Sequence, residues 1–74
     1  MRFEQLLDEA SKSVQLPEMA RILLPSTLSE QTKKMVMKLS PEDFGRIISS
    51  AIETINKGSV ESIDVLVKKK LNLD

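Results

Sequence analysis

Residues 40–58, SPEDFGRIISSAIETINKG, carry the clearest structural pattern in the chain. Ser40 is a favoured N-cap residue, Pro41 suits the first helical position, and the two acidic residues that follow stabilise a helix start through its dipole. Gly58 can adopt the left-handed conformation that ends many helices. The apolar residues between these signals recur at the spacing of one helical face: Phe44, Ile47, Ile48, Ala51, Ile52 and Ile55. The pattern predicts a helix over residues 41–56 at the centre of the fold.

Two helices are predicted near the start of the chain. Residues 2–14 place apolar side chains on one face and mostly charged side chains on the other, which is typical of a helix that buries one side. Pro17 can begin a short second helix over residues 17–24. We expect Pro25 to end it, because proline cannot donate a backbone hydrogen bond.

A third helix is indicated by Thr27 and Glu30, which have the spacing of a capping box. We expect this helix to run to about Leu39. The residues expected on its inward face are Leu28, Thr32, Met35, Val36 and Leu39. Met37 would then point to the opposite, exposed side.

The last predicted helix follows Ser59, a suitable N-cap, and runs to about Leu71. The residues expected to face inward are Val60, Ile63, Val67 and Leu71, with Leu66 at their margin. The connections between the helices are short, and 41% of the residues are apolar. We therefore predict an all-α fold, a compact four- to five-helix bundle in a single domain over residues 1–74.

The composition argues against an enzyme. The sequence has no histidine, cysteine, tryptophan or tyrosine, so it lacks the usual general base near neutral pH, a thiolate nucleophile and the best nitrogen and sulfur metal ligands. None of the carboxylates falls on a predicted apolar face, where burial would raise its pKa toward acid–base use. We expect no catalytic residue, no cofactor, no metal ion and no small-molecule substrate.

Charge and targeting signals also limit the function classes. The 11 basic and 11 acidic residues give a net charge of zero, so no general attraction to nucleic acid or to an anionic membrane is expected. No apolar run has the length of a signal peptide or a membrane span. The absence of cysteine means that the fold needs no oxidising compartment. We expect a cytoplasmic protein.

Nucleic-acid binding is the alternative function. Ala51, the turn at Gly58 and the helix after it have roughly the layout of a helix-turn-helix unit, although Glu61 and Asp64 would repel phosphate there. A second helix-turn-helix-like pairing, from Ala20 through Pro25 into the third helix, suits phosphate better. Its third helix carries a strip of lysines: Lys33, Lys34 and Lys38. The simpler interpretation is that these lysines are solvent-exposed charges with no binding role.

A short motif lies near the predicted start of the last helix. Glu61-Ser62-Ile63-Asp64 is similar to the Asp-Ser-Leu site at which acyl carrier proteins take phosphopantetheine. In those proteins two further helices follow the serine, whereas about a dozen residues follow it here, too few for a helix pair. We expect Ser62 to be a polar residue of the first helical turn.

Apolar side chains that the predicted core does not absorb indicate a contact surface. They are Met19, Ile22, Leu23, Met37 and Val65. The three lysines of the third helix would steer an acidic partner toward them. The sequence therefore predicts a small non-enzymatic protein–protein interaction module, regulatory or inhibitory, that occupies the surface of another protein or of a second copy in a homodimer.

Overall fold

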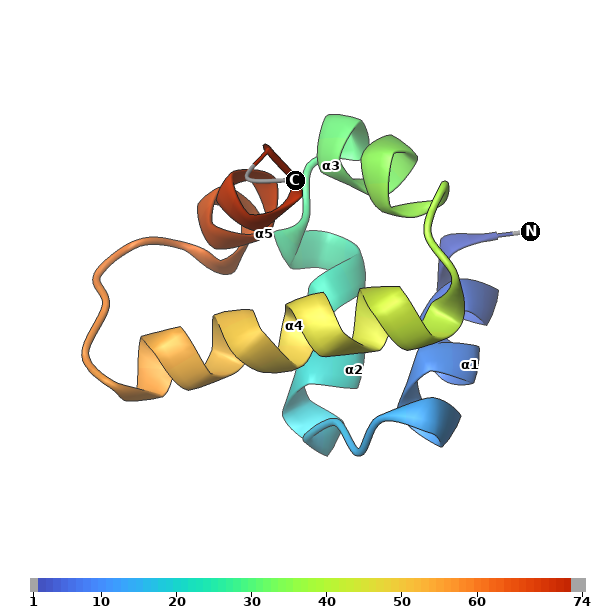
Figure 1. Ribbon diagram of the computed structural model, residues 1–74, viewed down its shortest axis with the longest axis horizontal. Helices are drawn as coiled ribbons and strands as arrows, with labels where there is room; N and C mark the ends of the chain where they lie inside the picture. The colour runs from blue at the N-terminus through green and yellow to red at the C-terminus, as the bar shows by residue number, and fades with distance from the viewer. Residues whose placement is uncertain (1, 73–74) are drawn as a thin grey trace.

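The computed structural model describes residues 2–72 and contains five α-helices (Figure 1). They are α1 (Phe3–Ser13), α2 (Glu18–Thr27), α3 (Glu30–Val36), α4 (Pro41–Asn56) and α5 (Ile63–Asn72). The described residues form no strand, so the predicted all-α bundle is confirmed.

Helix α4 is the longest element and crosses the middle of the bundle (Figure 1). It packs against α1 and α5, whereas α2 packs mainly against α1. Its start is as predicted, because Ser40 Oγ accepts a hydrogen bond from the backbone N–H of Asp43 at 3.2 Å and Pro41 is the first helical residue. After its end, Gly58 has a φ of +108°, the left-handed conformation expected of a glycine cap.

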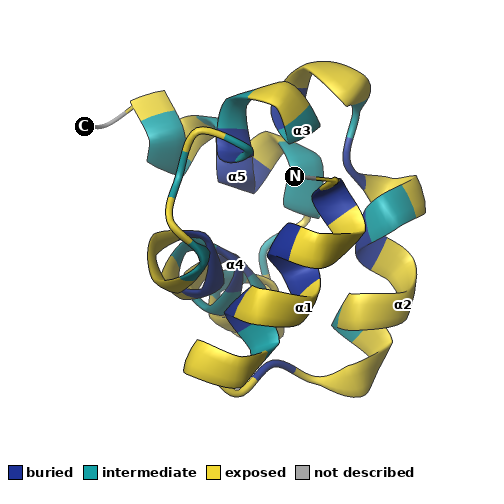
Figure 2. Ribbon diagram, turned by 90° about the vertical axis from the view of Figure 1, so that its right-hand side faces the viewer, coloured by how far each residue is buried: buried dark blue, intermediate teal, exposed yellow. Residues whose placement is uncertain are grey.

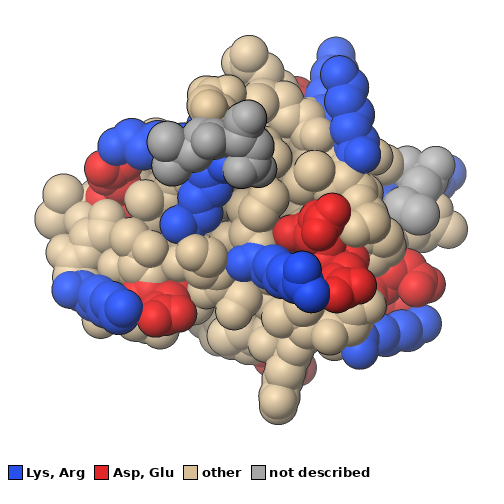
Figure 3. Space-filling view, viewed as in Figure 1, with Lys and Arg blue, Asp and Glu red and all other residues tan. Residues whose placement is uncertain are grey.

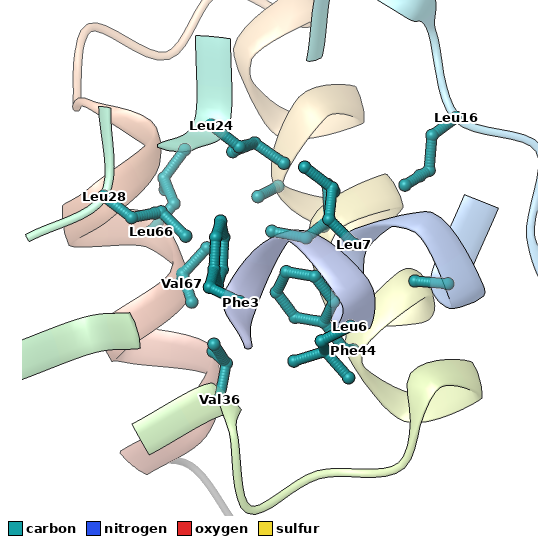
Figure 4. Packing of buried hydrophobic residues seen from close by; sticks show 13 residues of the cluster. Phe3, Leu6, Leu7, Leu16, Leu24, Leu28, Val36, Phe44, Leu66 and Val67 are labelled. Carbon is teal, nitrogen blue, oxygen red and sulfur yellow. The ribbon is translucent and has the colours of Figure 1, made fainter. Parts of the chain in front are cut away.

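The core lies where α1, α4 and α5 meet (Figure 4). The rings of Phe3 and Phe44 are arranged edge to face, with their centroids 5.8 Å apart. This geometry suits the quadrupoles of the two rings. The other buried apolar residues are Leu6, Leu7, Ala10, Leu16, Leu24, Leu28, Val36, Ile48, Ala51, Leu66 and Val67.

The boundary predicted at Pro25 is wrong, because α2 continues through this proline to Thr27. Proline lacks one N–H, but the helix closes its last turn with other donors. The hydroxyl of Thr27 donates to the carbonyl of Leu23 at 2.7 Å, and the N–H of Leu28 donates to Leu24. Thr27 is therefore not the cap of α3.

Helix α3 is shorter than predicted at both ends. Its N-cap is Ser29, whose Oγ accepts from the N–H of Thr32 at 3.2 Å. The helix ends at Val36, and the next turn tightens to i→i−3 hydrogen bonds, such as that from the N–H of Leu39 to Val36. The exposed position predicted for Met37 is wrong, because this tighter turn carries it beyond the helix and its side chain packs against the core.

Helix α5 begins later than predicted, at Ile63. Ser62, not Ser59, caps it, since Ser62 Oγ accepts from the N–H of Val65 at 3.3 Å. Val60 therefore lies in the preceding loop, where it is fully exposed instead of inward-facing. Leu66, expected at the margin of the inward face, is buried.

Candidate functional site

Most residues of helix α2 are exposed (Figure 2). Leu24 is the one buried residue among its ten. Met19, Ile22 and Leu23 are 65%, 64% and 49% exposed, and their i, i+3, i+4 spacing places them side by side on the helix. We call these three residues the α2 ridge.

A groove separates one flank of the ridge from the end of α4, and we call it the α2–α4 groove. Its volume is about 670 Å³. Met19 and Leu23 line it on one side and Ile52 and Ile55 on the other. Its further lining residues are Pro17, Ala20, Leu24, Thr27, Asn56, Glu61, Ser62 and Ile63. The sequence pattern does not predict the exposure of Ile55. This residue belongs to the apolar face of α4, but it lies at the end of the helix, where the neighbouring helices no longer cover that face.

A second groove lies on the other flank of the ridge, between α1 and α2, and we call it the α1–α2 groove. Its volume is about 570 Å³, and Ile22 lines it together with charged residues. These are Glu4, Asp8, Glu18 and Arg21. An Arg21 guanidinium nitrogen lies 2.8 Å from a carboxylate oxygen of Asp8, which leaves Glu4 and Glu18 without an ion pair among residues 2–72.

The remaining predicted site residues lie elsewhere. Val65 is 40% exposed on α5, but it lines neither groove. Met37 is half-buried after the end of α3. The structure thus brings together the three predicted residues of α2 and separates them from Met37 and Val65.

The lysine strip is only partly a solvent-facing feature. Lys33 Nζ lies 5.4 Å from the ring centroid of Phe3 and 3.5 Å from a carboxylate oxygen of Glu30, and its side chain is 19% exposed. Lys34 and Lys38 are exposed. None of the three lines either groove beside the α2 ridge. On the face viewed in Figure 3, basic side chains are scattered and several adjoin acidic ones.

The start of α5 is fixed to α3 by a partly buried carboxylate. Asp64 accepts a hydrogen bond from the backbone N–H of Ser29 at 2.9 Å, and Lys68 Nζ lies 3.6 Å from its other oxygen. Burial by itself would raise the pKa of Asp64, but these contacts and the hydroxyls of Thr32 and Ser29 hold it below its ordinary value. The first half of α5 therefore serves to hold α5 against α3.

The same region departs from a helix-turn-helix unit. Residues 57–62 connect α4 to α5, a longer link than the turn of about three to four residues in that motif.

The described residues offer few other functional features. Residues 2–72 contain no group of three or more carboxylate, histidine or cysteine side chains arranged to hold a metal ion. Within the same range, no helix combines the length and the apolar character needed to cross a membrane.

No known protein family, curated protein or solved structure matches this chain.

Proposed function

We propose that this chain is a non-enzymatic protein–protein interaction module that docks through the α2 ridge and the grooves beside it. It would act as an adaptor or inhibitor by occupying the surface of another protein. The observation that carries the proposal is the exposure of Met19, Ile22 and Leu23 on a helix with a single buried residue. The cysteine-free sequence suits a reducing compartment, and we propose a cytoplasmic location.

The physical argument is the area of apolar surface left in water. Burying such area contributes about 25 cal/mol per Å², so three adjacent apolar side chains provide a driving force for association. One exposed Leu or Met would need no explanation, but here they form a continuous ridge between two grooves. A protein surface is the occupant that covers a ridge and its flanks together, as in helix-in-groove recognition.

The experiment is a tagged pull-down from lysate of the source cells, with and without nuclease. Three proteins are compared: the unchanged chain, the double variant Met19→Gln/Leu23→Gln, and the control Ser50→Gln. Glutamine fits a helix and leaves the charge unchanged, so the double variant removes only apolar contact. Ser50 is exposed on α4 and lines neither groove.

We expect a discrete partner that survives nuclease, is lost with the double variant and is kept by the control. A partner captured equally by all three proteins would show that the α2 ridge is not the binding surface. Capture that disappears with nuclease, and with Lys34→Glu/Lys38→Glu, would instead establish nucleic-acid binding.

A further inference from the structure

The α2 ridge has unpaired acidic groups on one flank, the α1–α2 groove, whereas the single carboxylate on its other flank is ion-paired. In the α1–α2 groove, three carboxylates face one guanidinium, and the exposed carboxylates of Glu4 and Glu18 form no ion pair within residues 2–72. In the α2–α4 groove, Glu61 is the one charged lining residue. One of its oxygens accepts a hydrogen bond from Lys69 at 2.7 Å, while the other is buried without a hydrogen-bond partner in the described chain.

We propose that the α2 ridge receives an amphipathic helix of a partner protein whose apolar face is flanked by lysine or arginine side chains. This inference rests on the proposed function and names the chemistry of its partner. The apolar side chains of that helix contact Met19, Ile22 and Leu23, and its basic side chains lie toward Glu4 and Glu18. Charge complementarity of this kind favours the correct partner and speeds association.

The same charges argue against the other occupants. A second copy docked through this surface would bring two acidic-edged ridges together, and like charges at an interface oppose association. Nucleic acid would place phosphates against Glu4 and Glu18. The lysines predicted to steer an acidic partner lie on α3 or, for Lys38, in the turn after it, and they line neither groove, so the surface selects a basic partner instead.

The test is selection from a phage-displayed library of helical peptides with randomised outer positions, using the whole chain as bait. We expect the enriched peptides to share an i, i+3, i+4, i+7 apolar pattern and to carry more lysine and arginine than acidic residues. Bait carrying Glu4→Gln/Glu18→Gln should keep the apolar pattern but lose the basic excess. A selected peptide should bind this double variant roughly fivefold more weakly, the scale of two exposed charge pairs. Bait carrying Lys34→Gln/Lys38→Gln, a matched control at two exposed lysines outside both grooves, should select the same peptides as the unchanged chain.

The other outcomes distinguish failure of the basic partner from failure of the proposed function. Enriched peptides that depend on Met19 and Leu23 but lack a basic excess would overturn this inference and leave the proposed function standing. Absence of enrichment, or enrichment unaffected by Met19→Gln/Leu23→Gln, would overturn both. Sedimentation that shows a dimer of the chain, dissociated by the same double variant, would assign the ridge to a second copy and refute the basic partner.

Discussion

Helices α4 and α2 both carry apolar stripes, yet the bundle covers them very differently. Phe44, Ile48 and Ala51 of α4 have no exposed surface, whereas Met19 and Ile22 of α2 are 65% and 64% exposed. α4 has α1 and α5 packed against it, and α2 has mainly α1. Helical periodicity therefore identifies an apolar face, but the number of neighbouring helices determines whether that face becomes core or remains a surface.

The largest difference between the two helices should appear on truncation to alanine. Phe44→Ala removes a buried ring and its contact with Phe3, so we expect the free energy of unfolding to fall by about 3–5 kcal/mol. Ile22→Ala should change it by no more than about 0.5 kcal/mol, because most of this side chain is already in water. Urea denaturation followed by circular dichroism measures both. If the two variants lose the same free energy of unfolding, α2 contributes to the core as much as α4 does.

The contact between α4 and α1 at Gly45 should give the next largest effect. A Cβ built there would lie 2.9 Å from Val14 Cγ2 and 3.3 Å from the carbonyl oxygen of Ala10. Overpacking costs about 1–3 kcal/mol, against a gain of about 1 kcal/mol in helix propensity, so Gly45→Ala should lower the free energy of unfolding by up to about 2 kcal/mol.

The matched control for this change is Ser50→Ala on the exposed side of α4, which should be neutral or slightly stabilising. Adding Val14→Ala to Gly45→Ala should recover part of the loss in a double-mutant cycle. If the effects of the two changes on the free energy of unfolding simply add, the clash with Val14 is not the reason why Gly45→Ala is destabilising.

Asp64 provides a polar contact between the start of α5 and the N-cap of α3. Its pKa is lowered in the folded state, so its contribution to stability is fully present above its unfolded pKa of about 3.9 and is lost as the pH falls through the folded value. Asp64→Asn should therefore lower the free energy of unfolding by about 1 kcal/mol at pH 7 and by progressively less on acidification. The measurement is urea denaturation at a series of pH values from 7 down to 2. If the free energies of unfolding of the unchanged chain and of Asp64→Asn differ by the same amount at every pH, the ionised carboxylate of Asp64 does not stabilise the fold.

Much of the fold could be predicted from the sequence because its signals are local. The cap at Ser40, the proline at position 41 and the left-handed Gly58 each act within one helical turn, and all three are as predicted. The errors fall at the ends of α2, α3 and α5. Thr27 lies in the last turn of α2, where its hydroxyl donates to the carbonyl of Leu23, and no pattern in the sequence distinguishes this position from the cap of the next helix.

The candidate site could be predicted only in part. Met19, Ile22 and Leu23 were found because their helix has more apolar sides than a small bundle can cover. Met37 was misplaced because its exposure depended on where α3 ends. The acidic flank was not predicted, since Glu4 and Glu18 are separated by 13 residues and only the packing of α1 against α2 brings them to one groove.

The smallest effect on stability should come from charge on the α2 ridge itself. Met19 is the second residue of α2, where the helix dipole favours a negative side chain, so Met19→Asp should change the free energy of unfolding by less than about 0.5 kcal/mol. Met19→Lys should be less stable than Met19→Asp by about 0.5 kcal/mol, for the same reason with the opposite sign. Both variants lose the apolar contact with the partner, but lysine also repels a basic helix. We therefore expect Met19→Lys to bind a selected peptide more weakly than Met19→Asp does, when binding is measured by fluorescence anisotropy at low salt. The reverse order would mean that the partner's flanking charge is acidic, and equal affinities would mean that charge on this ridge plays no part in recognition.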